Sequence, residues 1–211
     1  GDTEDYKGET LSPICAKGTP YSFWYRRGTE NKLLMYYQGG GACWDNESCW
    51  HGDRFRDFAG QRGCVLGSNP GTNCTLEGDA ACTGGGTCGP YFSEDNPDLV
   101  GTGFADSSDP DNPFKEWHIV FVTYCTGDVH WGNAFGAYGP GQGIQHRGRI
   151  NAMVAEKFAR EHFPNPEEVF VTGSSAGSYG ALFNSAFLMD EVYPASEFNV
   201  LGDAGIGVIT K

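Results

Sequence analysis

The sequence has 211 residues, with 14 basic and 27 acidic side chains and a formal net charge of −13. This charge argues against nucleic acid and anionic membranes as partners. No apolar run approaches the ~20 residues of a membrane span, and no N-terminal signal segment is present, so an exported protein would be in its mature form. The length suits one good-sized domain, which we expect to cover residues 1–211.

Eight cysteines lie in loop-like surroundings rich in glycine, asparagine and threonine. Their positions are Cys15, Cys43, Cys49, Cys64, Cys74, Cys82, Cys88 and Cys125. The even number and these surroundings predict disulfides and a secreted, periplasmic or other extracellular location. No CxxC pair occurs, which argues against a zinc site, and we expect no bound metal. We expect the pairs Cys43–Cys49 and Cys15–Cys125 and leave the other four cysteines open.

In chain order, an extended lead-in over residues 1–20 is followed by apolar, β-branched runs alternating with helical patterns. We expect strands at 21–25, 33–38, 117–124, 168–172 and 198–201 and helices at 144–163 and 176–190. This order predicts an α/β fold with a mostly parallel central sheet and helices on both faces.

Residues 42–116 contain no confident strand or helix but hold six of the eight cysteines. We therefore expect a disulfide-stapled insertion within the domain. Its acidic turn at 106–112 lacks the EF-hand pattern; a solvated turn is favoured over a calcium site, which is left open.

Gly173-x-Ser175-x-Gly177 lies between a predicted strand and a predicted helix, the context of a nucleophile elbow. Small residues permit the sharp turn, and the N–H groups of the following helix point toward the reacting group. The alternative is a glycine-rich turn whose serines cap the helix. We predict that Ser175 is a nucleophile.

Acyl transfer through serine needs two N–H groups aimed at the developing oxyanion. In this architecture one comes from the residue after the nucleophile, here Ala176, and the other from a glycine-rich loop after an earlier strand. Gly39–Gly41 follows the predicted strand 33–38 directly. We therefore predict an oxyanion loop there, held in place by a Cys43–Cys49 cystine.

Four further side chains follow the glycine loop or the strand at 117–124: Trp44, Asp128, His130 and Trp131. We expect them to line a substrate cleft, because the loops after parallel strands surround the site in such folds. Packing in the core or the insertion is the alternative for the tryptophans.

Three segments, Tyr37–Cys43, Tyr124–Gly132 and Gly173–Gly177, resemble the signature segments of the pectin acetylesterase/Notum family, in that family's order. The resemblance covers residues 33–205 apart from the insertion. It implies an α/β-hydrolase fold and a secreted serine carboxylic-ester hydrolase with a Ser-Asp-His triad and no cofactor.

By position, the resemblance implies that Ser175 is the nucleophile and that Gly40, Gly41 and Ala176 supply the oxyanion donors. Ala42 departs from the tryptophan that the family usually has in or beside the glycine segment. Because that position borders the acyl pocket, the family's acyl preference is not carried over.

No histidine follows Ser175, whereas triad partners in α/β hydrolases come in the order Ser, Asp/Glu, His. We therefore expect this chain to be the N-terminal part of the domain, with Lys211 at a processing point. The triad Asp and His would then lie on a second polypeptide from the same precursor. An upstream triad of His51, Asp128 and Ser175 would have the order of a β-barrel protease, which does not suit this fold.

The elbow and the glycine loop predict acyl transfer through Ser175, and the resemblance implies a serine carboxylesterase that deacetylates a polysaccharide such as pectin through an acyl-enzyme. The net charge of −13 disfavours a polygalacturonate backbone, so a neutral acetylated glycan, a small ester or an aliphatic polyester is the alternative. A non-catalytic, disulfide-rich binding module with the same fold is the alternative from a different class.

Overall fold

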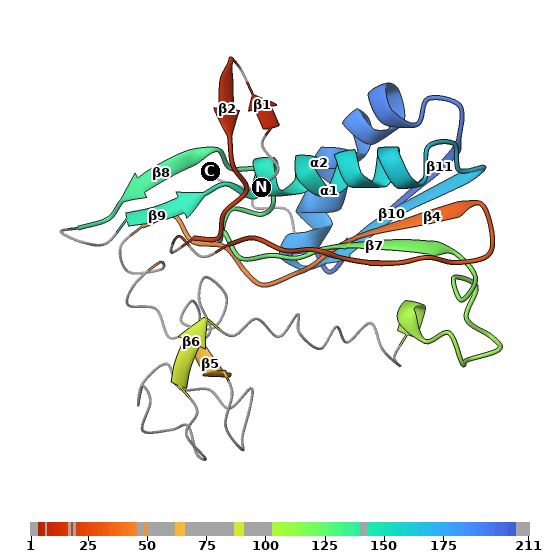
Figure 1. The fold of residues 1–211 in the computed structure, drawn as a ribbon, viewed down its shortest axis with the longest axis horizontal. Coiled ribbons are helices and arrows are strands. Elements are labelled where there is room, and N and C mark those ends of the chain that lie inside the picture. Colours follow the sequence, from red (N-terminus) through yellow and green to blue (C-terminus); the bar gives the residue numbers. More distant parts are fainter. Residues whose placement is uncertain are drawn as a thin grey trace.

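The computed structural model describes residues 4–6, 8–16, 18, 20–45, 49, 62–65, 87–90, 103–139 and 143–205 (Figure 1). The strands are β1 (Glu4–Tyr6), β2 (Glu9–Leu11), β3 (Trp24–Arg26), β4 (Lys32–Tyr37), β5 (Arg62–Val65), β6 (Thr87–Pro90), β7 (His118–Val122), β8 (Ala134–Ala137), β9 (Gly143–His146), β10 (Glu168–Ser174) and β11 (Glu197–Asp203). The helices are α1 (Gly148–His162), α2 (Ala176–Phe187), the 3₁₀ turn η4 (Gly103–Ala105) and the π-turn η5 (Leu188–Val192).

The central sheet has the strand order β11-β10-β4-β7-β3. All neighbouring strands are parallel except the edge strand β3, which runs antiparallel to β7. Strand β4 lies in the middle, and its residues Leu33, Leu34, Met35 and Tyr37 are fully buried. A strand buried on both faces needs apolar residues at successive positions, which explains the continuous apolar run. The predicted mostly parallel sheet is confirmed.

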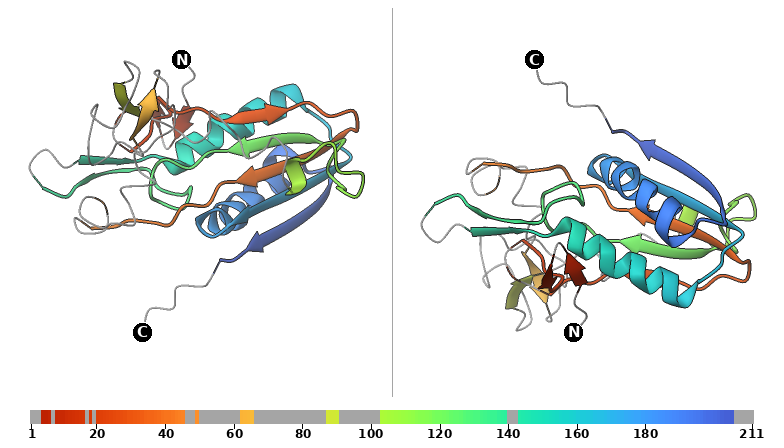
Figure 2. Two further views of the ribbon diagram at one scale, coloured as in Figure 1. Left: turned by 90° about the horizontal axis from the view of Figure 1, so that it is seen from below. Right: turned by 90° about the horizontal axis from the view of Figure 1, so that it is seen from above.

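Alternate residues of the strands point to opposite faces of the sheet, so a different set of elements packs on each face. Helices α1 and α2 pack on one face, against a cluster that includes Met35, Val120 and Val171. The opposite face carries Leu34 and Ile119 and is covered by η4 and the segment that follows it. Figure 2 shows α1 and α2 beside the sheet and β11 at its outer edge.

The structure differs from the sequence-based prediction around residue 144. The helix begins at Gly148, and the residues before it form β9, which pairs antiparallel with β8. Ile144 is fully buried in a small cluster with Cys43 and Cys49 instead of lying on a helix face. The backbone N–H of Gly148 donates to the Asp128 carboxylate, which fixes the start of the helix. Strands β1 and β2 also form a hairpin in the predicted lead-in.

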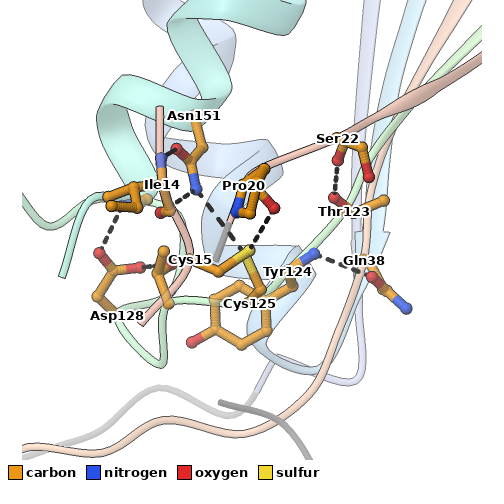
Figure 3. Close-up of a disulfide and its surroundings, with 12 residues drawn as sticks. Ile14, Cys15, Pro20, Ser22, Gln38, Thr123, Tyr124, Cys125, Asp128 and Asn151 are labelled. Atoms are coloured by element: carbon orange, nitrogen blue, oxygen red, sulfur yellow. Dashed lines mark hydrogen bonds between the residues drawn. A yellow bond between two sulfur atoms is a disulfide. The ribbon is translucent and has the colours of Figure 1, made fainter. Parts of the chain in front are cut away.

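Both expected disulfides, Cys15–Cys125 and Cys43–Cys49, are present. The first connects the N-terminal segment to the residues after β7, across a sequence separation of 110 (Figure 3). Asn151 of α1 reinforces this attachment, because its amide bonds both backbone groups of Ile14. The N-terminal segment is therefore tied to the sheet and to α1.

Most of the predicted insertion at 42–116, including Cys74 and Cys82, lies outside the described residues; within it, β5 and β6 pair antiparallel, with Cys64 opposite Cys88 in the register. In the acidic turn, Asp106 accepts hydrogen bonds from the backbone and hydroxyl of Ser108, and these bonds lower the pKa of Asp106. The Asp106 carboxylate is therefore bonded within the turn itself.

Among the described helices, none combines the length and apolar character needed to cross a bilayer.

Candidate active site

Ser175 lies at a sharp turn between β10 and α2. Its backbone has φ 57° and ψ −120°, a conformation that costs a non-glycine residue on the order of 1–3 kcal/mol. Two interactions hold it: the Ser175 N–H donates to the Asp203 carbonyl at 2.9 Å, and the Ser178 hydroxyl donates to the Ser175 carbonyl at 2.8 Å. The residue is exposed at the N-terminus of α2. Strained backbone and exposure together are the geometry of a nucleophile elbow.

The two outer glycines of the motif permit close packing of backbone on backbone. A side chain at Gly173 would place its Cβ 2.6 Å from the Tyr37 carbonyl oxygen, and one at Gly177 would place it 1.9 Å away. At the start of the glycine loop, a Cβ on Gly39 would lie 2.4 Å from the Ser174 carbonyl oxygen and 3.3 Å from the Ser175 Cβ. The structure therefore brings the predicted oxyanion loop against the predicted nucleophile.

The glycine loop offers unused N–H donors beside the elbow. Gly40 has φ 153° and Gly41 has φ 76°, values that glycine adopts at little cost. Within the described part of the chain, the N–H groups of residues 39–42 and of Ala176 donate no hydrogen bond. Donors in this position suit a negatively charged oxygen bound near Ser175.

His130 lies behind the glycine loop, not on an open cleft, which differs from its expected place. Its side chain is 1% exposed, and its Nε2 donates to the Gln38 carbonyl at 2.8 Å. The Asp128 carboxylate is likewise engaged, by the Thr126 hydroxyl at 2.6 Å and by the N–H of Gly148 at 2.7 Å. Both side chains hold the loops around the site together.

Burial lowers the pKa of His130 to about 4, because the imidazolium form would lose its hydration; the hydrogen bond to Gln38 and the charge of Asp128 offset this only in part. The unfolded chain binds this proton near pH 6.5, so the folded state loses stability as the pH falls from 6.5 toward 4. Between pH 7 and 4.5, wild type should lose about 2–3 kcal/mol more than a His130→Gln variant. Urea unfolding at the two pH values measures this difference.

The matched control is His162→Gln, because His162 is exposed and its Nδ1 bonds only the Phe158 carbonyl of its own helix. That variant keeps His130 and should therefore still lose stability between pH 7 and 4.5. An equal pH dependence of wild type and His130→Gln would show that His130 titrates normally in the folded protein.

The two predicted cleft tryptophans are exposed, Trp44 to 72% and Trp131 to 50%. The Trp131 ring packs on Phe183 of α2, with ring centroids 5.3 Å apart, and the Arg149 guanidinium lies 5.9 Å from the centroid of the Trp131 ring. Trp131 thus belongs to the exposed side of α2, the helix that begins at the elbow.

None of the four histidines in the described residues contacts Ser175. His118 accepts from the Gly28 N–H, and His146 donates to the Thr126 carbonyl and accepts from the Tyr138 hydroxyl. His51, the base of the alternative upstream triad, lies outside the described residues. The described part therefore brings the predicted nucleophile beside the predicted N–H donors, and none of its histidines lies at the serine.

One group of potential metal ligands lies close together in the described residues: Cys43, Cys49 and His146. The two sulfurs form a disulfide, and both nitrogens of His146 are hydrogen-bonded. These donors do not fit a metal ion, because ligation needs free thiolates and an unshared nitrogen lone pair.

Sequence reasoning missed two residues that support the glycine loop, Gln38 and Tyr124. The backbone N–H of Tyr124 donates to Gln38 Oε1 (Figure 3), and the Tyr124 hydroxyl donates to the Gly41 carbonyl; both distances are 2.9 Å. Gln38 directly follows β4, and Tyr124 lies two residues after the end of β7. Both are at the carboxyl ends of these parallel strands, the edge of the sheet at which β10 leads into the elbow. That position was the signal available in the sequence.

A serine elbow between a parallel strand and a helix, facing a glycine loop from a neighbouring strand, defines an α/β-hydrolase fold. The chain belongs to the pectinacetylesterase family, whose model matches residues 90–209. No curated protein matches the chain.

Among solved structures, the chain is similar to the Wnt deacylase Notum from Drosophila, with a TM-score of 0.54 and 19% sequence identity. The alignment covers 90% of this chain and 48% of that one. The chain therefore spans about half the length of the structure it matches, and at this identity the similarity concerns the fold.

Proposed function

We propose that this chain carries the nucleophile and the oxyanion hole of a secreted serine carboxylesterase that removes acetyl groups from a polysaccharide such as pectin. The observation that carries the proposal is the elbow itself: Ser175 at φ 57° beside free N–H groups of Ala176 and the glycine loop. Membership of the pectinacetylesterase family supports the reaction class. The two disulfides support an extracellular location.

In the proposed reaction, Ser175 Oγ attacks the ester carbonyl carbon while a histidine base takes its proton. The carbonyl π electrons move onto oxygen, and the N–H groups of Gly40, Gly41 and Ala176 stabilise that oxyanion. Collapse expels the alcohol, which receives the proton from the histidine, and leaves an acyl-enzyme. Water, deprotonated by the same base, then releases the carboxylate and restores the serine.

We further propose that the acid and the base lie on a second polypeptide from the same precursor, which completes the sheet beside β11. The outer strand β11 exposes Val200 and Leu201, α2 exposes Leu182 and Phe183, and η5 exposes Met189. Apolar side chains gathered at an open sheet edge favour cover by further chain. The neighbouring solved structure, about twice as long in the same fold, supports this.

The charge favours a second substrate class as the alternative. At a net charge of −13, the protein would repel a polygalacturonate backbone, whereas a neutral acetylated glycan, a small ester or an aliphatic polyester meets no such barrier. The exposed rings of Trp44 and Trp131 offer apolar faces on which either sugar rings or polymer chains can stack.

The experiment that tests the proposal is acetate release by the purified active protein, whose composition is first established by intact mass before and after reduction. We expect two polypeptides and release of acetate from acetylated pectin. The rate should rise with ionic strength, because salt screens the repulsion between like charges. Acetylated xylan, which is less charged, serves as the comparison.

Release from acetylated xylan or a small ester, but not from pectin at any salt concentration, would transfer the function to the neutral-ester alternative. A single active polypeptide would overturn the proposal of a second chain. No ester hydrolysis by the intact protein would leave the binding module as the remaining interpretation.

A further inference from the structure

The residues after β7 form a support for the glycine loop. We call Tyr124–Gly132 the support segment. It contacts both ends of the glycine run: at the first end, Tyr124 N and His130 Nε2 donate to the side-chain and backbone oxygens of Gln38. At the far end, Tyr124 Oη donates to the Gly41 carbonyl, and Gly127 O accepts from the Cys43 N–H at 2.8 Å.

The Tyr124 hydroxyl is itself held in place. It accepts from the Val129 N–H at 2.8 Å, and its ring lies against the His130 ring with centroids 4.6 Å apart. The side chain is buried, and burial holds the pKa of Tyr124 well above its usual value, so the hydroxyl keeps its proton for donation. Tyr124 is therefore a fixed donor aimed at one carbonyl of the loop.

Such a support matters because three consecutive glycines restrict their own backbone very little. In a planar trans peptide, the C=O of one residue and the N–H of the next point in opposite directions. Holding the Gln38 and Gly41 carbonyls toward the support segment therefore turns the N–H groups of Gly39 and Ala42 away from it. The two peptides between these fixed planes carry the N–H groups of Gly40 and Gly41. They are confined from both sides, beside the elbow.

We infer that Tyr124 is a positioning residue for the oxyanion loop, and that its hydroxyl sets the orientation of the loop's N–H donors before substrate binds. The inference rests on the proposed esterase function and adds a residue to its machinery. Preorganised donors lower the barrier because they need no reorientation when the oxyanion forms. Their loss should therefore appear in kcat and not in KM.

The test is Tyr124→Phe, which keeps the ring packed on His130 and removes only the hydroxyl. We expect kcat to fall about 10- to 100-fold, somewhat less than the loss of a whole oxyanion donor, with KM within about twofold of wild type. Rates are expressed per active site, titrated to completion with a fluorophosphonate, so that any unfolded fraction does not count. Thermal unfolding of each variant is recorded in parallel.

The matched control is Tyr25→Phe, because Tyr25 is an exposed tyrosine of β3 whose ring contacts Phe158, away from the loop. It should retain wild-type kcat. A second variant, Gln38→Met, removes the acceptor of the Tyr124 N–H and should lower kcat in the same direction; it decides the matter if Tyr124→Phe does not fold.

A wild-type kcat per titrated site in Tyr124→Phe, with or without a lower unfolding temperature, would show that Tyr124 is structural only and overturn the inference while leaving the esterase intact. An inactive wild-type protein would instead overturn the proposed function, and this inference with it.

Discussion

Ser175→Ala is expected to lower kcat for ester hydrolysis by a factor on the order of 10⁶, because a triad enzyme without its nucleophile retains only binding and oxyanion stabilisation. Alanine carries the same Cβ as serine, so the backbone strain at φ 57° is unchanged and thermal stability should stay close to wild type. The measurement is kcat and KM for acetate release, with the unfolding temperature recorded for both proteins.

The matched control for this variant is Ser185→Ala. Ser185 is partly exposed on the same helix, and its hydroxyl donates to the Leu182 carbonyl one turn earlier, so its loss should leave kcat unchanged. If Ser175→Ala kept more than about a hundredth of wild-type activity, another residue would have to be the nucleophile.

Gly177→Ala should have the largest effect on the fold at the site. The new methyl carbon would lie 1.9 Å from the Tyr37 carbonyl oxygen, and the atoms it meets belong to the backbone of β4, which cannot rotate away. Helix α2 must then move off the sheet, which costs about 3 kcal/mol or more in the free energy of unfolding. The displacement separates Ser175 from the glycine loop, so activity should fall at least about 10²-fold.

This destabilisation runs against helix propensity, since alanine in a helix interior is about 1 kcal/mol better than glycine. Gly202→Ala is the matched control, because the nearest atoms to a Cβ there belong to the side chains of Leu182 and Ser178, both at 3.3 Å. Urea unfolding of both variants measures the difference. A Gly177→Ala protein as stable as Gly202→Ala would mean that α2 and β4 are less closely packed than described.

The central strands and the elbow could be predicted because their determinants are local. Strand β4 shows its burial on both faces as a continuous apolar run. The elbow shows itself as Gly173-x-Ser175-x-Gly177 between an apolar strand and a helix, all within one short stretch of sequence. The pairing Cys43–Cys49 was also predictable, because the two cysteines are six positions apart beside one loop.

The hairpin β8–β9 could not be predicted, because its strands are short and contain Gly136 and Gly143, residues that weaken a strand pattern. Ile144 continues the helical spacing of α1 by coincidence, while its burial against the Cys43–Cys49 disulfide is a tertiary contact. No pattern in the residues around Ile144 indicates such a contact.

The place of His130 was missed for a similar reason. A histidine in a loop after a strand is the usual position for a residue of a binding cleft, yet this one faces the Gln38 carbonyl, 92 positions earlier in the chain. The support segment as a whole acts through contacts with a distant loop, so its role becomes visible only when both loops are placed in space.

The central claim is that Ser175 is an activated nucleophile, and the most direct measurement is labelling of the purified protein with a fluorophosphonate, followed by peptide mass mapping. The account predicts stoichiometric modification of the peptide that contains Ser175, at a rate far above that of free serine, and no modification in Ser175→Ala. An unlabelled Ser175 in a protein that hydrolyses esters, or a label on another residue, would contradict it.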